Sequence, residues 1–121
     1  MILTIALPHV NPLMDSALVR EIFPQVGSLL LPGAKLLDIK VDLSLAVTHD
    51  CPPESHHRIA LRERAWLRQR LVGVGDEVVV GAPLLILTTD PDEDWETGPQ
   101  RAARVTQVGI LPQTNWWDQS V

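Results

Sequence analysis

The sequence contains little cysteine, few aromatic residues other than tryptophan, and no long apolar run. Cys51 is the single cysteine among 121 residues, so an intrachain disulfide is excluded and nothing indicates an oxidising compartment. No apolar stretch approaches the roughly 20 residues of a membrane-spanning helix. The first eight residues also lack the basic region of a signal peptide. We therefore expect a cytoplasmic protein without membrane insertion.

Composition and charge further narrow the class of protein and of its binding partners. The hydrophobic fraction of 45% and the charged fraction of 21% are ordinary for a single globular domain. The formal net charge of −5 argues against a general affinity for nucleic acid or for anionic membranes. One Phe and no Tyr accompany four Trp, three of which follow residue 94. The remaining partner class is protein.

One stretch of the chain occurs twice. Residues 17–42 and 65–90 align without a gap at an offset of 48, with nine identical positions: Ala17/Ala65, Arg20/Arg68, Val26/Val74, Gly27/Gly75, Gly33/Gly81, Ala34/Ala82, Leu36/Leu84, Leu37/Leu85 and Asp42/Asp90. Two glycines six residues apart in each copy mark turns that need positive φ. The pattern predicts strand, turn, short strand, turn and strand, duplicated.

The alternation of apolar and polar residues is clearest from Leu37 to Val47, where it predicts one long, half-buried strand. Residues 58–71 have helix-forming composition. We expect a strand there, since the repeat equates residues 65–71 with a strand in the first copy, and helix stays the alternative. The other expected segments are an edge strand at 2–7, strands at 18–23 and 29–31, a loop at 49–57, a short strand and a strand within 72–90, an acidic loop at 90–98, and an added strand at 103–111.

The duplicated unit resembles the biotinyl/lipoyl carrier domain family over about residues 2–90. Gly27, Gly33, Leu36, Ile39 and Asp42 stand where lipoyl domains have their first-half motif, and the second half matches through Val72, Gly75, Asp76, Val78, Gly81 and Leu84. The resemblance implies an all-β fold, a pseudo-twofold flattened β sandwich (barrel-sandwich hybrid) with an extended central hairpin. Residues 1–90 would form this domain. Residues 91–121 would add the acidic loop, one strand and a Trp-containing tail packed on it.

The family attaches its cofactor to a lysine at the hairpin tip, and Leu43 occupies that position here. Lys40 lies three residues away and therefore points to the opposite face of the strand. The resemblance thus implies a scaffold that carries no lipoyl or biotinyl group. Modification of a non-standard lysine, Lys35 or Lys40, stays an alternative.

A polar loop at the expected hairpin end brings metal-ligating residue types together. His49, Cys51, His56 and His57 fall within nine residues, and imidazole with thiolate suits a divalent metal such as zinc. The spacing matches no standard zinc finger, so an exposed, solvated loop is the competing interpretation. No nucleophile motif, carboxylate pair or phosphate loop indicates catalysis.

Arginines of one parity line residues 58–70. In a single strand they would share one face with Trp66 and form a docking surface for an acidic protein partner, with Arg62, Arg64, Trp66 and Arg68 at its centre. The alternative is local compensation by Asp38, Asp42 and the acidic loop. Trp116 and Trp117 in the tail are further candidate contacts, within the domain, in a homodimer or with a partner. The leading hypothesis is a non-catalytic interaction or assembly module, accessory to a larger enzyme or transport system. The alternative is a metal- or thiol-dependent function of the loop at residues 49–57.

Overall fold

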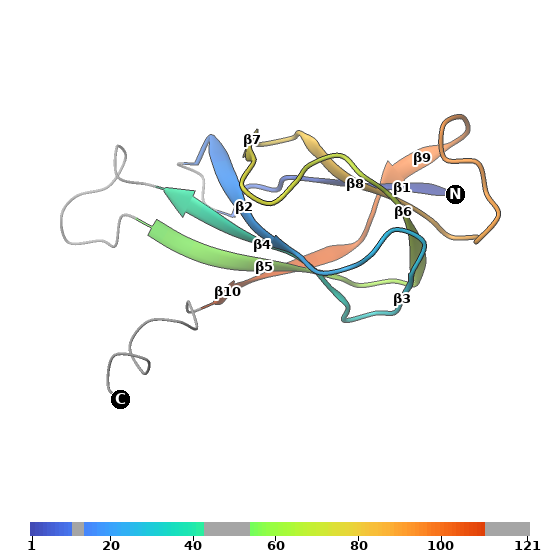
Figure 1. The fold of residues 1–121 in the computed structure, drawn as a ribbon, viewed down its shortest axis with the longest axis horizontal. Helices are drawn as coiled ribbons and strands as arrows, with labels where there is room; N and C mark the ends of the chain where they lie inside the picture. The colour runs from blue at the N-terminus through green and yellow to red at the C-terminus, as the bar shows by residue number, and fades with distance from the viewer. Residues whose placement is uncertain (11–13, 43–53, 111–121) are drawn as a thin grey trace.

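The computed structural model describes residues 1–10, 14–42 and 54–110, and all the regular elements in these ranges are β strands (Figure 1). They are β1 (Ile2–Ala6), β2 (Ser16–Ile22), β3 (Leu29–Leu30), β4 (Lys35–Asp42), β5 (Glu54–Leu61), β6 (Ala65–Arg70), β7 (Glu77–Val79), β8 (Pro83–Thr88), β9 (Gln100–Ala102) and β10 (Val105–Ile110). None of the described residues belongs to a helix that could cross a membrane.

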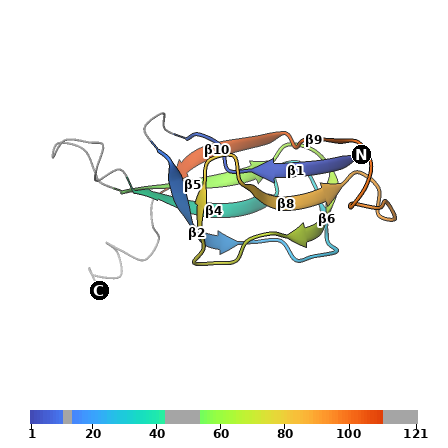
Figure 2. The same cartoon turned by 90° about the horizontal axis from the view of Figure 1, so that it is seen from above.

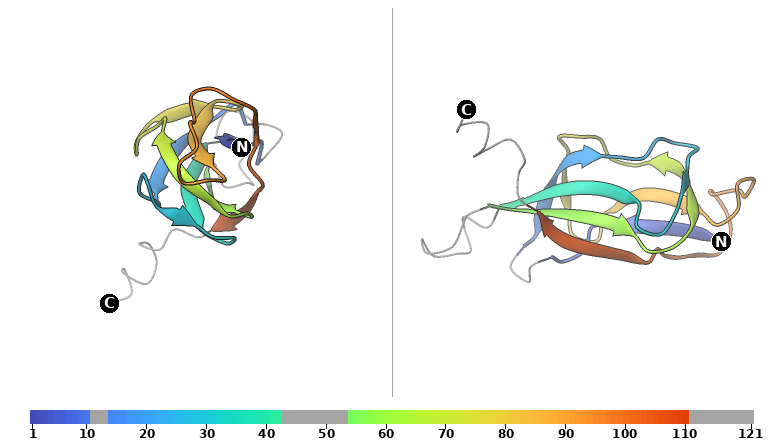
Figure 3. Two further views of the ribbon diagram at one scale, coloured as in Figure 1. Left: turned by 90° about the vertical axis from the view of Figure 1, so that its right-hand side faces the viewer. Right: turned by 90° about the horizontal axis from the view of Figure 1, so that it is seen from below.

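The strands form two five-stranded sheets that enclose one core. The first has the order β3-β6-β8-β1-β9 and the second the order β10-β5-β4-β2-β7, and neither closes into a barrel. Figures 2 and 3 show the two layers from further directions. The core cluster draws buried side chains from both sheets, among them Leu3, Leu37, Ile39, Leu85 and Leu87. The sequence therefore predicts the fold class correctly as an all-β sandwich.

The repeat is reproduced in the strand register. In the β2–β4 pair, Leu18 lies opposite Lys40 and Val19 opposite Ile39, and a bulge follows. In the β6–β8 pair, Trp66 lies opposite Thr88 and Leu67 opposite Leu87, with a bulge at the same place. These pairs are related by the offset of 48 residues. The two copies are therefore the same structural unit, including the local irregularity of the ladder.

Each copy completes the sheet of the other. The short strand β3 of the first copy pairs with β6 of the second, and β7 of the second pairs with β2 of the first. Gly27 donates its N–H to the carbonyl of Leu67 at 2.7 Å, and Gly75 donates to the carbonyl of Val19 at 2.8 Å. Both glycines have positive φ, +92° and +96°, which side chains disfavour. Such reciprocal exchange is what a twofold axis between the copies produces.

The alternation of β4 is confirmed where the structure describes it. Leu37, Ile39 and Val41 are fully buried, while Lys40 between them is half-buried on the other face. Asp38 also faces outward and is 9% exposed, because its neighbours cover it. The predicted continuation at residues 43–47, including Leu43, lies outside the described residues.

Four details of the expected strand pattern are wrong. The segment 58–71 is extended, as expected, and not helical, but it forms two strands, β5 and β6, instead of one, because the chain turns at residues 62–64 and changes sheets. Residues 54–57 belong to β5 and not to a loop, since they pair with β4. The first strand is not at an edge, because β9 pairs with it in parallel. β9 itself has no periodicity in three residues and was not expected.

Candidate interaction face

The arginines of residues 58–70 do not form the single stripe that their parity predicts. Arg58 lies on β5 in one sheet, whereas Trp66, Arg68 and Arg70 lie on β6 in the other. The turn at residues 62–64 separates them. Arg62, in this turn, donates to the Thr106 hydroxyl at 3.1 Å. The expected docking surface is therefore divided between the two sheets, and its arginines have different surroundings.

Arg58 has a partner within its own sheet. Its guanidinium donates to both carboxylate oxygens of Asp38, at 2.8 and 3.1 Å, and lies 5.2 Å from the centroid of the Phe23 ring. The hydrogen bond to Asp38 raises the pKa of Arg58. Local compensation across β4 and β5 is thus confirmed for this arginine.

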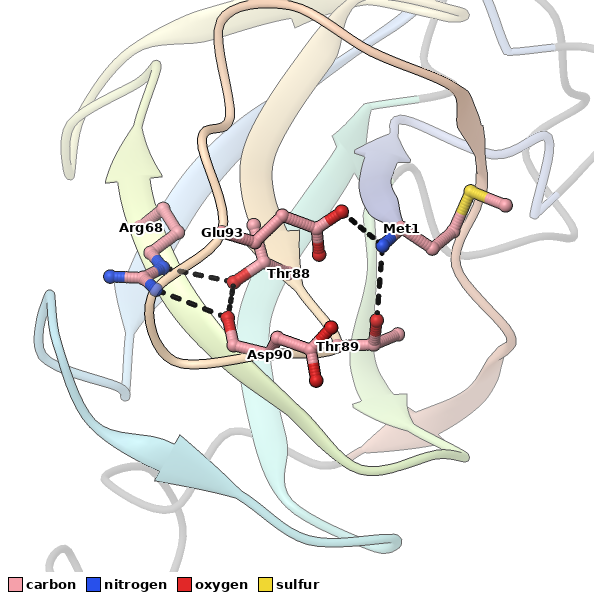
Figure 4. Close-up of polar contacts among 6 residues, drawn as sticks. All are labelled: Met1, Arg68, Thr88, Thr89, Asp90 and Glu93. Carbon is pink, nitrogen blue, oxygen red and sulfur yellow. Dashed lines mark hydrogen bonds and ion pairs between the residues drawn. The ribbon is translucent and has the colours of Figure 1, made fainter.

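Arg68 holds the acidic loop against the first sheet (Figure 4). It donates to the Thr88 hydroxyl at 2.9 Å and to the carbonyl of Asp90 at 3.1 Å, and it lies 5.3 Å from the Trp95 ring. The α-ammonium of Met1 donates to the Thr89 hydroxyl at 3.1 Å and pairs with Glu93. Arg68 therefore binds a segment of its own chain.

Glu63 ties the C-terminal strands to the turn between β5 and β6. Its carboxylate accepts two hydrogen bonds from Arg101, at 2.5 and 2.9 Å, and one from the backbone N–H of Arg104 at 2.7 Å. These bonds hold the linker through which the chain passes from β9 in one sheet to β10 in the other. The Arg101 hydrogen bonds, followed by the Arg104 N–H, hold the pKa of Glu63 below its usual range.

We expect Glu63→Gln to lower the free energy of unfolding by about 1–2 kcal/mol at neutral pH, since charge-assisted hydrogen bonds are lost. Because the folded-state pKa is depressed, the contribution is present above the unfolded value of about 4.3 and disappears as pH falls through the lower folded value. Urea unfolding of both proteins from neutral to acidic pH measures this convergence. Glu96→Gln, on the exposed loop, is the control. A difference that stays constant down to pH about 3 would contradict the assignment.

An exposed apolar surface lies where β3 borders β6. We call it the Trp66 face, and it consists of Leu29, Leu31, Arg64 and Trp66. Leu29 lies directly opposite Trp66 in the ladder, and Leu29 and Leu31 are 42% and 57% exposed. The Arg64 guanidinium lies 5.1 Å from the Trp66 ring centroid. The face thus combines an aromatic ring, two leucines and a positive charge at the edge of a sheet.

The duplicated unit provides an internal comparison for this face. At the offset of 48, Leu29 and Leu31 correspond to Glu77 and Val79. Likewise, Trp66 and Arg64 correspond to Leu18 and Ser16, and the Ser16 hydroxyl donates to Glu77 at 3.1 Å. The two surfaces have equivalent backbones and different chemistry. The tryptophan and arginine are therefore not required by the fold.

The residues proposed for a metal site are only partly within the described chain. His49 and Cys51 lie outside it. His56 and His57 are neighbours on β5 and so point to opposite faces of the sheet, where His57 Nε2 lies 2.9 Å from the Ser55 hydroxyl. Within the described ranges, no three His, Cys, Asp or Glu side chains gather into a group suited to a metal ion.

The chain matches no protein-family model, and no curated protein is similar to it in sequence. The assignment of candidate residues therefore depends on the geometry of this chain. The Trp66 face includes Arg64 and Trp66 from the sequence prediction. It adds Leu29 and Leu31, for which the sequence predicts a short strand and no role. Their alignment with Glu77 and Val79 in the repeat is the signal that distinguishes them. Trp116 and Trp117 lie outside the described residues.

Proposed function

We propose that the protein is a non-catalytic protein–protein interaction or assembly module with an unmodified lipoyl-like fold, accessory to a larger enzyme or transport system. The two copies that exchange short strands support the lipoyl-like part of this proposal. The Trp66 face is the observation that carries the interaction part. A cytoplasmic location and the absence of a bound cofactor belong to the same proposal.

The chemistry of the Trp66 face suits a partner that presents apolar side chains beside a carboxylate. Tryptophan and arginine are among the residue types most enriched in energetically dominant interface contacts. The chain as a whole carries a net charge of −5, but Arg64 places a positive charge on the Trp66 face. An acidic patch on a partner is therefore attracted to this face more than to the rest of the surface. The leucines on β3 supply apolar area next to the ring.

A pull-down from the native cell with Trp66→Ala and Leu18→Ala tests this function. The two residues occupy equivalent positions of the repeat, and both are half-buried. We expect Trp66→Ala to weaken partner capture about 30-fold or more, as for a contact worth at least 2 kcal/mol. Leu18→Ala should leave capture unchanged. Equal capture by both variants would refute the assignment of the face.

Loss of capture at raised salt would add support for the role of Arg64, because exposed charges are screened.

The alternative functions that the sequence suggests have separate readouts. Intact mass would reveal a group on Lys35 or Lys40, and metal analysis of the purified chain would reveal stoichiometric zinc in the 49–57 segment.

A further inference from the structure

The two sheets have four edge strands, and β10 differs from the other three. β3 contains two residues, β7 contains three including Glu77, and β9 contains three including Arg101. Short length and charge are the devices by which proteins keep sheet edges from pairing. β10 has the sequence Val-Thr-Gln-Val-Gly-Ile, six residues without charge or proline. No strand of the described residues pairs with its outer side (Figure 1).

The hydrogen-bonding groups on the outer side of β10 follow from its register with β5. The N–H of Arg62 donates to the carbonyl of Arg104 at 2.8 Å, one step beyond the pair of Val105 with Leu61. In an antiparallel ladder, hydrogen-bonded and non-hydrogen-bonded pairs alternate. Thr106, Val108 and Ile110 therefore bond to β5. The N–H and C=O groups of Val105, Gln107 and Gly109 point to the open edge.

We propose that β10 pairs antiparallel with β10 of a second copy, about a twofold axis at Gln107. This register places Gln107 opposite Gln107 of the second copy and Val105 opposite Gly109. All three outward-pointing residues then form hydrogen-bonded pairs, with about six main-chain hydrogen bonds in total. The two sheets become one continuous sheet across the dimer.

The side chains fit this self-pairing. A glutamine amide has both a donor and an acceptor, so two of them meet at the axis as complementary groups. On the outer face, Thr106 lies opposite Val108 of the second copy, a pair of β-branched residues that favours strand association. Val108 is 51% exposed in the single chain. Because β10 has no charged residue, no like-charged side chains of the two β10 strands meet in this arrangement.

Light scattering after sizing, from micromolar to millimolar concentration, tests the dimer. A single strand pair buries less area than a standard interface, so we expect a dissociation constant in the micromolar range and twice the 13.4 kDa chain mass at high concentration. Val108→Lys and Gln107→Pro should each raise the dissociation constant about 100-fold. The N–H of Gln107 does not bond β5, so proline is tolerated there.

Val79→Lys is the matched control, since Val79 is 63% exposed on β7 at the other edge of the same sheet. It should leave the dimer unchanged. Amide exchange gives a second readout: Val105, Gln107 and Gly109 should gain protection with concentration, while Thr106 and Val108 are protected throughout. A parent that stays monomeric, or a dimer that survives both β10 variants, would overturn the proposal. A third result would also overturn it: a full-length chain that stays monomeric while a chain truncated after Ile110 dimerises. That result would mean that residues 111–121 occupy the edge in the full-length chain.

Discussion

Leu37→Ala should lower the free energy of unfolding by about 2–5 kcal/mol, the cost of a cavity at a fully buried leucine. Leu37 lies on β4 with none of its surface exposed, in the core between the two sheets. Single domains of this size are stable by about 5–15 kcal/mol, so the loss is a large fraction of the total stability. Urea unfolding followed by fluorescence of the tryptophans measures the loss.

The repeat provides an equivalent core position at which the same substitution can be tested. Leu85 is the equivalent of Leu37 on β8 and is equally buried, so Leu85→Ala should cost a similar amount. Leu31→Ala, at a side chain that is 57% exposed, should change stability by less than about 0.5 kcal/mol. If the two core variants were no more destabilised than this control, the sheet packing described here would be wrong.

Asp38→Ile should lower the free energy of unfolding by about 2–3 kcal/mol, because it leaves the half-buried guanidinium of Arg58 without its carboxylate. The pair is bidentate, and the side chains are 12% and 24% exposed. Arg58→Thr alone should also destabilise, since it leaves the Asp38 carboxylate unpaired. Thermal and urea unfolding of the single variants measure both effects.

The double variant Asp38→Ile/Arg58→Thr should recover most of the loss. Its residues are those at the corresponding place in the other sheet, where Ile86 of the second copy lies opposite Thr4 of β1 as Asp38 lies opposite Arg58. Replacing a buried ion pair with well-packed residues is often neutral. Additive losses in the double variant would show that the ion pair does not couple the two residues.

The sequence predicts the duplicated β unit well because glycine and alternation are local signals. Gly27 and Gly75 are at turns with positive φ, and Leu37, Ile39 and Val41 are buried, as their spacing requires. The exchange of β3 and β7 between the copies is a long-range pairing that no local signal indicates.

The candidate face could be predicted less completely. The parity of residues 58–70 indicated a single stripe because the turn at residues 62–64 has neither glycine nor proline to reveal it. Arg64 and Trp66 are together on the Trp66 face, but Arg58 and Arg68 bind Asp38 and the acidic loop. Those partners depend on tertiary contacts between segments that are 20 or more residues apart.

The exchange of short strands has a consequence for how the chain acquires its structure during synthesis. The first copy emerges from the ribosome with β2 lacking its neighbour β7, and Gly27 lacking its acceptor on Leu67. Neither sheet can be completed before the second copy has been synthesised. The two halves therefore cannot fold one after the other as independent units. Most of the pairing is non-local, which slows folding relative to helical domains of this length. Until then the apolar faces of the strands in the first half stay exposed, which makes the nascent chain prone to aggregation.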